Sequence, residues 1–256
     1  MPRWLTHPSL TGHVPGSEEW FAAQRRMIAV KPLVENCYRL WYRLLLEDAD
    51  SAPLDGIIVE LGSGSSFLKQ LRPETVTSDV VEGNADLVFD GRRLPFRAAS
   101  VRALLLTHVF HHIPDVGAFL SECERVLIPG GVVSIVDCAH TPFSRFFFGK
   151  IHPEPYDWRR QPWDFPEGKT LFDSNQALTW MVFVRDRARF EREFPRLRIE
   201  NRTWLPWFGY LCSGGVNLRS LVLRPLVPAF RILDRLSRPL DPLCAIHWHW
   251  TLRRSA

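Results

Sequence analysis

Short apolar runs alternate with amphipathic stretches through the middle of this chain. The apolar runs are predicted strands, and they occupy residues 56–61, 75–80, 85–90, 101–109 and 131–138. Between the last two, residues 115–127 repeat their apolar positions at helical spacing, which predicts a helix. Strands that alternate with helices favour a parallel sheet wrapped by helices. We therefore predict a doubly wound α/β fold.

Two helices are predicted before this region. Ser17, followed by two acidic residues, is typical of a helix N-cap and predicts a helix over residues 18–30. A second helix should follow Pro32, where apolar residues recur at steps of three and four. Residues 48–56 are polar, contain a proline and predict a linker. We divide the chain into an N-terminal helical segment, residues 1–55, and a main domain, residues 56–256.

The regular alternation ends after Asp137. Residues 139–170 contain five prolines and many aromatic and charged residues, which predicts a long lid rather than a simple connection. Helical patterns return over residues 175–184 and 186–194, and strands are predicted at residues 197–204 and 246–252. The main domain therefore has a core at 56–138, a lid at 139–170 and a helical insertion at about 205–243.

The composition excludes several classes of protein. With 256 residues, 46% of them hydrophobic and 23% charged, the chain has enough apolar material for a core and is not a disordered protein. No uncharged apolar run is long enough to span a bilayer, and the first twenty residues lack the features of a secretory signal, so we expect a cytoplasmic protein. The five cysteines are scattered and form no C-x-x-C pair, which argues against disulfides.

A glycine turn is predicted at the end of the first strand. Residues 59–66 read Val-Glu-Leu-Gly-Ser-Gly-Ser-Ser, and such a turn lets a ligand approach the backbone and the start of a helix. A dinucleotide site would need a third glycine, and Phe67 stands at that position. The chain also has no Tyr-x-x-x-Lys pair, which argues against a nicotinamide-dependent oxidoreductase or epimerase. Asp79 ends the next strand, where its carboxylate can accept hydrogen bonds from ribose hydroxyls. These features together predict a nucleoside ligand.

Five sequence pieces in a fixed order resemble the class I S-adenosylmethionine-dependent methyltransferases, and among them the type 11 group. They are Glu60 to Gly64, Asp79, Phe89-Asp90 with Leu94-Pro95-Phe96, His108 to Asp115, and Arg125 to Gly131. The resemblance covers about a third of the chain. It implies a Rossmann-like, mostly parallel sheet with an antiparallel last strand.

The resemblance and the chemistry of S-adenosylmethionine imply a role for each residue of the expected cofactor site. The cationic amino acid tail of the cofactor suits the Glu60 carboxylate and the backbone at Gly62 and Gly64. Asp79 suits the ribose and Asp90 the adenine amino group. The resemblance further implies that Val80 and Leu94 pack on the adenine and that His108 lines the methionine end. One departure is Ser66, where the family usually has a third glycine.

Methyl transfer is an in-line displacement that requires alignment and an acceptor able to lose a proton. For a hydroxyl acceptor, we rank His111 and His152 first as general bases, ahead of His112, Glu154 and Asp157. The interpretation with more weight is that His111 and His112 only cap or pack the next helix. We predict no metal site, because His152-Pro153-Glu154 has no third ligand at a recognised spacing.

The C-terminal residues 201–256 carry eight arginines against two acidic residues, a local charge of +6. If residues 228–238 are helical, Arg231, Arg235 and Arg238 share one side and apolar residues the other. Residues 204–243 could then lie on an anionic membrane or receive a lipid-linked acceptor. The alternative is an ordinary cap over the substrate with solvated arginines. We expect no nucleic-acid partner, because the rest of the chain is mildly acidic.

We therefore predict an S-adenosylmethionine-dependent methyltransferase that acts on a small-molecule, lipid-linked or sugar-linked acceptor, most favourably on oxygen. We expect it in the cytoplasm, with peripheral contact at the inner face of the membrane as a further expectation. The alternative from another class is a catalytically silent protein that binds the same cofactor in a regulatory or structural role.

Overall fold

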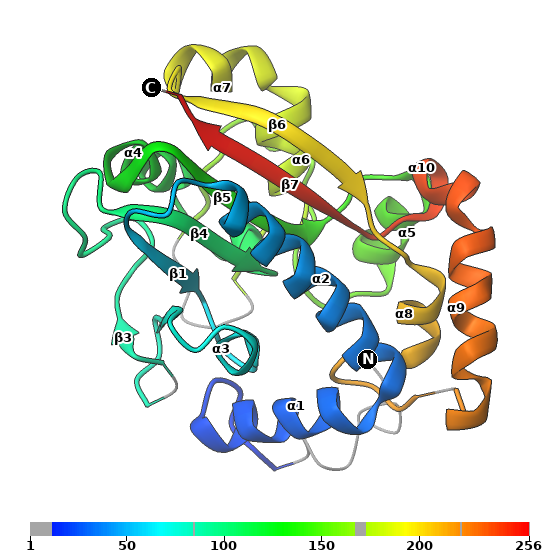
Figure 1. The fold of residues 1–256 in the computed structure, drawn as a ribbon. Helices are drawn as coiled ribbons and strands as arrows, with labels where there is room; N and C mark the ends of the chain where they lie inside the picture. The colour runs from blue at the N-terminus through cyan, green and yellow to red at the C-terminus, as the bar shows by residue number, and fades with distance from the viewer. Residues whose placement is uncertain (1–11, 84, 167–172, 221, 256) are drawn as a thin grey trace.

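The computed structural model describes residues 12–83, 85–166, 173–220 and 222–255. Within them a seven-stranded sheet runs in the order β3-β2-β1-β4-β5-β7-β6 (Figure 1). β7 pairs antiparallel with both β5 and β6, whereas the other pairs of neighbouring strands are parallel, which confirms the predicted mostly parallel sheet with an antiparallel last strand. The strands are β1 (Ile57–Leu61), β2 (Val76–Asp79), β3 (Leu87–Val88), β4 (Val101–Thr107), β5 (Leu127–Cys138), β6 (Leu197–Trp204) and β7 (His247–Arg254).

Two long helices precede the sheet, as the sequence predicts. The Ser17 hydroxyl caps α1 (Glu18–Val30) by accepting a hydrogen bond from the Trp20 amide at 3.2 Å. The second helix, α2 (Pro32–Ser51), continues into the stretch predicted as a linker. The reason is Asp48, whose carboxylate accepts hydrogen bonds from Ser134, His249 and Thr251 and so ties the end of α2 to β5 and β7. The linker prediction was wrong for residues 48–51.

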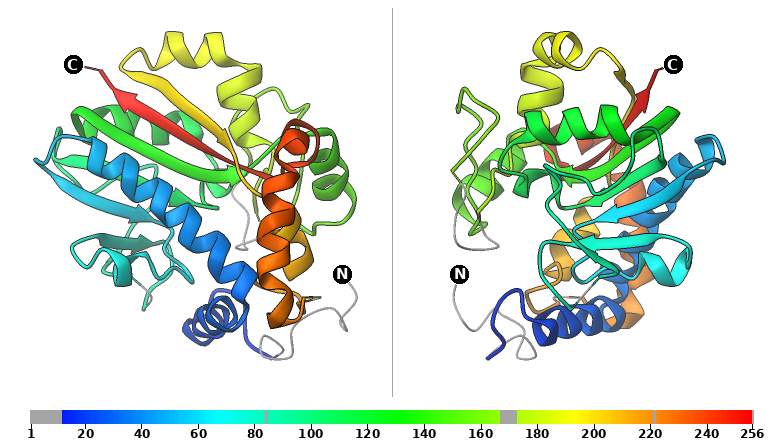
Figure 2. Two further views of the ribbon diagram at one scale, coloured as in Figure 1. Left: turned by 45° about the vertical axis from the view of Figure 1, so that its right-hand side comes forward. Right: turned by 90° about the vertical axis from the view of Figure 1, so that its left-hand side faces the viewer.

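Helices cover both faces of the sheet (Figure 2). The central strand β4 alternates between the two faces, because Ala103 and Leu105 pack under α2 whereas Leu104 and Leu106 pack in the opposite cluster. A strand buried on both sides reads as a continuous apolar run, as β4 does. The second face is covered by α4 (Val116–Val126), a 3₁₀ turn η2 (Phe110–His112), α6 (Leu178–Trp180), the π-helical turn η3 (Met181–Arg185) and α7 (Arg187–Glu193).

The stretch predicted as a lid begins with a helix that the pattern did not indicate, α5 (Pro142–Lys150). Its start is a capping box, in which the Thr141 hydroxyl accepts from the Ser144 amide at 3.0 Å and the Ser144 hydroxyl accepts from the Thr141 amide at 2.6 Å. Residues 151–166 continue as turns, and residues 167–170 of the predicted lid lie outside the described residues.

A helical layer stands at the edge of the sheet before β7 (Figure 1). It consists of α8 (Phe208–Ser213), η4 (Arg224–Leu226), α9 (Val227–Leu236), η5 (Arg238–Leu240) and α10 (Asp241–Cys244). The Phe208 and Phe230 rings stack at 5.7 Å, and Asp234 accepts a hydrogen bond from the Gly209 amide at 3.0 Å, so α9 is fixed to α8. No helix in the described part of the chain is long and apolar enough to cross a membrane.

Candidate functional site

A cavity of about 640 Å³ opens at the carboxyl ends of the parallel strands. Ligands of open α/β sheets bind at this edge, because the turns that follow the strands converge there. The cavity is lined by the glycine turn after β1, the end of β2, the residues after β4 and β5, α1, the predicted lid and the loop after α8. Sequence segments from both ends of the chain therefore meet in one site.

The glycine turn has the left-handed backbone that favours glycine, with φ of 60° at Gly62 and 43° at Gly64. A Cβ atom on Gly62 would lie 2.5 Å from the Val109 side chain, so a larger residue would also clash. The Asp79 carboxylate fixes this turn, since its Oδ2 accepts from the Gly64 amide and its Oδ1 from the Val80 amide, both at 2.8 Å. Oδ1 also accepts from the Val81 amide at 3.2 Å, so Oδ2 is the carboxylate oxygen that keeps a lone pair for a ligand hydroxyl.

Ser66 occupies the position where the resembled family has a third glycine, and its hydroxyl explains the departure. It donates to Glu60 Oε1 at 2.6 Å and accepts from the Tyr42 hydroxyl at 2.9 Å. The other oxygen of Glu60, Oε2, has no hydrogen-bond partner among the described residues, and burial raises the pKa of Glu60 to about 7. A buried carboxylate oxygen that lacks a donor suits the ammonium group of an amino acid ligand.

The residues expected around an adenine divide into two groups. Val80 and Asp90 line the cavity, and Asp90 pairs with Arg92, whose Nε atom lies 2.9 Å from Oδ2. Leu94 does not line the cavity, because its side chain is 3% exposed within the core and its amide is held by Glu122. Leu94 is therefore absent from the residues that line the cavity, where Val80 and Phe89 are among the apolar residues at the wall.

His111 lies between two carboxylates. Its Nδ1 is 2.5 Å from Asp137 Oδ1, and its Nε2 is 3.5 Å from Glu154 Oε2. Burial alone would lower the pKa of His111, but the two carboxylates outweigh burial and raise it to about 10. An imidazole held protonated has no lone pair free to accept a proton, so this arrangement does not favour the base role expected for His111.

The second expected base, His152, lines the same cavity on the predicted lid. Its Nδ1 accepts a hydrogen bond from the Glu154 amide at 3.3 Å, its ring packs on Phe148 at 5.5 Å, and burial lowers its pKa. Its packing orders the turn that carries Glu154. Sequence reasoning ranked Glu154 lower and missed Asp137, which lies near the end of β5 and shows its role only through the contact with His111.

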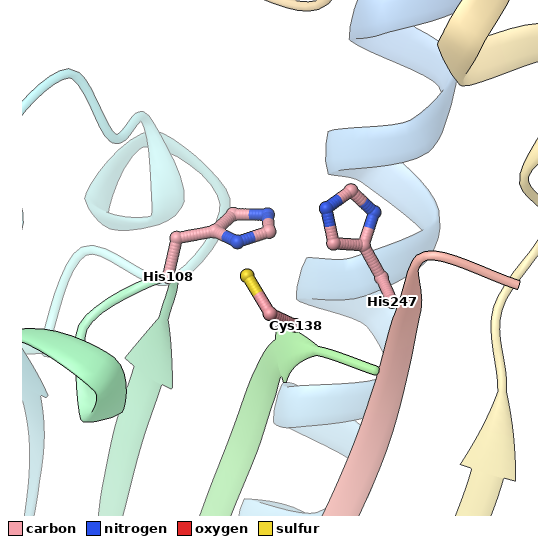
Figure 3. A group of neighbouring side chains, drawn as sticks. All are labelled: His108, Cys138 and His247. Carbon is pink, nitrogen blue, oxygen red and sulfur yellow. The ribbon is translucent and has the colours of Figure 1, made fainter. Parts of the chain in front are cut away.

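A second group of titratable side chains lies at the base of the cavity. His108, Cys138 and His247 line it, and Figure 3 shows the two imidazoles facing each other above the Cys138 thiol. Burial lowers the pKa of His108 to about 4 and that of His247 well below its usual range, so both rings are neutral. Sequence reasoning named only His108 from this group, because the three residues are too far apart along the chain to form a spacing motif.

The N-terminal helices and the loop after α8 close the cavity together. Arg25 donates to the Gly64 carbonyl at 3.0 Å, which fastens α1 to the glycine turn. Gln24 donates to Asn217 at 2.8 Å, and the Lys31 ammonium donates to the Gly215 carbonyl at 2.9 Å. These bonds make the N-terminal segment part of the site.

Comparison with known proteins gives one matching family model and many similar folds. Residues 61–135 match the family described as Methyltransferase domain. A chain from the complex of the Haloferax volcanii Trm112 methyltransferase activator with an assumed methyltransferase is 15% identical, with a TM-score of 0.50 and coverage of 93% of this chain and 95% of that one. An Archaeoglobus fulgidus SAM-dependent methyltransferase is 12% identical, with a TM-score of 0.50 and coverage of 85% and 94%.

The geranyl diphosphate C-methyltransferase of Streptomyces coelicolor A3(2), crystallised with Mg²⁺, geranyl diphosphate and S-adenosyl-L-homocysteine, has 17% identity and a TM-score of 0.48, with coverage of 98% and 89%. At such identities, likeness to solved structures shows the fold alone. The family match is the more specific finding, and it covers the glycine turn, Asp79, Asp90 and His111.

Proposed function

We propose that this chain is an S-adenosylmethionine-dependent methyltransferase and that it methylates an oxygen atom of a small or lipid-linked acceptor; the match of residues 61–135 to the family described as Methyltransferase domain supports the first part. One observation carries this proposal. A single cavity joins the glycine turn and Asp79 to the cluster of His111, Asp137 and Glu154. A methyl donor at one end and a proton acceptor at the other are what transfer to a hydroxyl requires.

The chain's residues fit the cofactor group by group. The unpartnered Oε2 of Glu60 would accept from the ammonium of the methionine tail, and Asp79 would accept from the ribose hydroxyls. Asp90 would accept from the adenine amino group while keeping its pairing with Arg92. When bound, the cofactor supplies an electrophilic methyl group on a sulfonium. The residues named here would hold that group in place and exclude water from it.

Glu154 is the residue we propose to receive the acceptor proton. Its carboxylate lies in the cavity, and burial alone would raise its pKa, but hydrogen bonding and charge from His111 lower it to about 2. Glu154 is therefore ionised, with lone pairs that can accept from an acceptor hydroxyl. His111, fixed by Asp137, would position the carboxylate and stabilise its charge. As the acceptor oxygen attacks the methyl carbon, its proton passes to Glu154.

The test is release of S-adenosylhomocysteine from S-adenosylmethionine in the presence of lipid and sugar extracts. Glu154→Gln should lower the turnover of an active fraction by about 100-fold or more, because general base catalysis is worth that much. Its affinity for S-adenosylmethionine should stay within about twofold of wild type. Glu191→Gln, on the exposed face of α7, is the matched control.

Two results would contradict this assignment. Full turnover by Glu154→Gln would remove Glu154 from the reaction. A wild-type protein that binds S-adenosylmethionine but releases no product with any fraction would be the catalytically silent binding protein instead.

The exposed surface of the C-terminal helical layer favours a lipid-linked acceptor. Apolar side chains face outward there, with Ile232 60% and Leu236 69% exposed. The sequence predicted arginines on the side opposite these residues, and Arg231 does turn inward, where it donates to Asn36 on α2. The loop after α8, in the same layer, lines the cavity through Val216 and Asn217. An apolar face beside basic residues suits an anionic membrane.

Sedimentation with vesicles of phosphatidylglycerol and phosphatidylcholine tests this surface. The double variant Ile232→Glu/Leu236→Glu should lose binding, because it removes the apolar contact with the membrane. The triple variant Arg231→Glu/Arg235→Glu/Arg238→Glu should also lose binding, because it removes the electrostatic attraction to the anionic lipids. Leu54→Glu changes an equally exposed leucine before β1 and should bind like wild type. Unchanged sedimentation of the double variant would exclude membrane contact through α9.

A further inference from the structure

The geometry points to a divalent zinc site formed by His108, Cys138 and His247, with one open coordination position facing the cavity. Their three donor atoms lie within 4.8 Å of one another. Two imidazoles and a thiolate are a ligand set that zinc prefers, and three protein ligands with a free fourth position are typical of catalytic zinc. The zinc site itself does not depend on the proposed function. Only the identity of the molecule that binds at the open position rests on it.

Three strand ends hold these ligands in place. Cys138 ends β5 and His247 begins β7, and the two residues are direct partners in the antiparallel ladder. His108 follows β4, and its amide donates to the Val136 carbonyl at 2.8 Å. Sites on strands are held more precisely than sites on loops. Donor atoms around tetrahedral zinc lie about 3.5 Å apart, so the side chains need to move by only about 1 Å.

The backbone of His108 supplies a second, independent observation. Its φ is 57°, in the left-handed region that non-glycine residues seldom adopt. This conformation turns the imidazole toward His247, with the ring centres 4.6 Å apart (Figure 3). Such strain persists where a function requires it.

Unsatisfied polar atoms distinguish this cluster from its neighbour. His108 Nε2 and His247 Nδ1 are buried and have no hydrogen-bond partner among the described residues. The neighbouring group of His111, His112 and Glu154 also brings three possible ligands together. In that group, however, His111 already pairs with Asp137 and Glu154, and the main-chain oxygen of Asp173 accepts from His112. The neighbouring group is satisfied without an ion.

The surroundings of the cluster also fit zinc. Each imidazole has one buried ring nitrogen with no hydrogen-bond partner among the described residues, and a neutral imidazole offers a nitrogen lone pair to an ion. The Cys138 thiol donates to the Gln176 side chain, and it would lose its proton to solvent when the ion binds. Trp41 packs on both rings, at 4.9 Å from His108 and 5.3 Å from His247, and shields the site from bulk water.

The open position faces the cavity in which the acceptor is proposed to bind. A hydroxyl or thiol bound there would lose its proton more easily, because the ion stabilises the anion that forms. That proton would pass to the Glu154 carboxylate in the same cavity. The freed electron pair would form the new bond to the methyl carbon, and the pair of the broken sulfur–carbon bond would stay on the cofactor sulfur. The acceptor class implied is an alcohol, phenol or thiol.

Cobalt substitution tests the site directly. The full chain, stripped with chelator and titrated with Co²⁺, should bind one ion and develop a strong near-ultraviolet thiolate-to-cobalt absorption that Zn²⁺ abolishes. Cys138→Ser should lose this absorption, and His247→Asn should bind Co²⁺ more than about 100-fold more weakly, since loss of an outer-shell partner alone costs about 10 to 100-fold. Cys212→Ser, a partly exposed cysteine on α8, should behave as wild type.

Circular dichroism and calorimetric titration with S-adenosylmethionine separate this test from the proposed function. Variants that keep the wild-type spectrum and cofactor affinity but lose cobalt support the site. No cobalt binding by the folded wild-type chain would overturn the inference. Loss of the absorption in Cys212→Ser would do so too, and so would cobalt bound without thiolate absorption and released by His112→Ala.

Discussion

The two ends of the cavity are built in different ways. At the cofactor end, the glycine turn, Ser66 and Asp79 bond to one another, and one buried carboxylate oxygen awaits a donor. At the proposed zinc site, two imidazoles and a thiol converge from three strands, and two ring nitrogens have no partner in the described part of the chain. The difference teaches that the proposed cofactor end is prearranged, whereas the proposed zinc site at the acceptor end is left to be completed by the ion it binds.

The largest effect should come from breaking the cofactor end. Asp79→Ala removes the acceptor of the Gly64 and Val80 amides as well as the partner of the ribose. Because hydrogen bonds to a charged group contribute about 1.5–3 kcal/mol each, we expect binding of S-adenosylmethionine to weaken by about 100-fold. Calorimetric titration measures this, with Asp55→Ala as an exposed control. Equal affinity in Asp79→Ala would show that the turn is only structural.

A smaller effect should come from the support beneath the acceptor end. Asp48 ties α2 to β5 and β7, the strands that carry Cys138 and His247. Asp48→Ala leaves buried donors unpaired and should lower the free energy of unfolding by about 2 kcal/mol at neutral pH, measured in urea. Glu47→Ala, at an exposed neighbouring position, should change it by less than about 0.5 kcal/mol.

The contribution of Asp48 also depends on pH. Burial alone would raise its pKa, but the bonds from His249, Ser134 and Thr251 lower it below the usual value for aspartate. The stabilisation is therefore complete above the unfolded pKa and disappears as the pH falls through the folded pKa. The stability difference between wild type and Asp48→Ala should shrink in this acidic range. A difference that stays constant there would contradict the account.

The smallest effect should come from removing a single hydroxyl group at the cofactor end. Ser66→Ala breaks the chain from Tyr42 through Ser66 to Glu60 and should weaken cofactor binding by about fivefold, or about 1 kcal/mol. Ser66→Gly, which restores the glycine of the family, should lose as much, and Ser65→Ala should lose less. Tighter binding by Ser66→Gly would show that the serine is a defect rather than a support.

Most of the fold could be predicted from the sequence, because strand and helix periods are local properties. The mostly parallel pairing of the sheet and the antiparallel β7 agree with expectation. The errors lie where tertiary contacts override local composition. The polar residues 48–51 are helical because Asp48 finds partners on β5 and β7, and α5 forms around a capping box within a proline-rich stretch.

The same distinction between local pattern and tertiary contact separates the site residues that the sequence predicted from those that it missed. Glu60, Asp79 and Asp90 belong to contiguous motifs, and the structure places all three at the cavity. Cys138 and His247 carry no local signal, because only the pairing of β5 with β7 brings them together. Leu94 shows the opposite case, since it belongs to a contiguous motif and yet its side chain packs in the core.

The central claim is that the proposed cofactor end is prearranged, so that it binds S-adenosylmethionine without help from the acceptor end. One calorimetric experiment tests this claim most directly. S-adenosylmethionine is titrated into the metal-free wild-type chain and into the metal-free double variant Cys138→Ser/His247→Asn, with NAD as the negative ligand. The account predicts one site of equal affinity, within about twofold, in both proteins and no binding of NAD. Cofactor binding that is lost in the double variant, or that is absent from both, would contradict it.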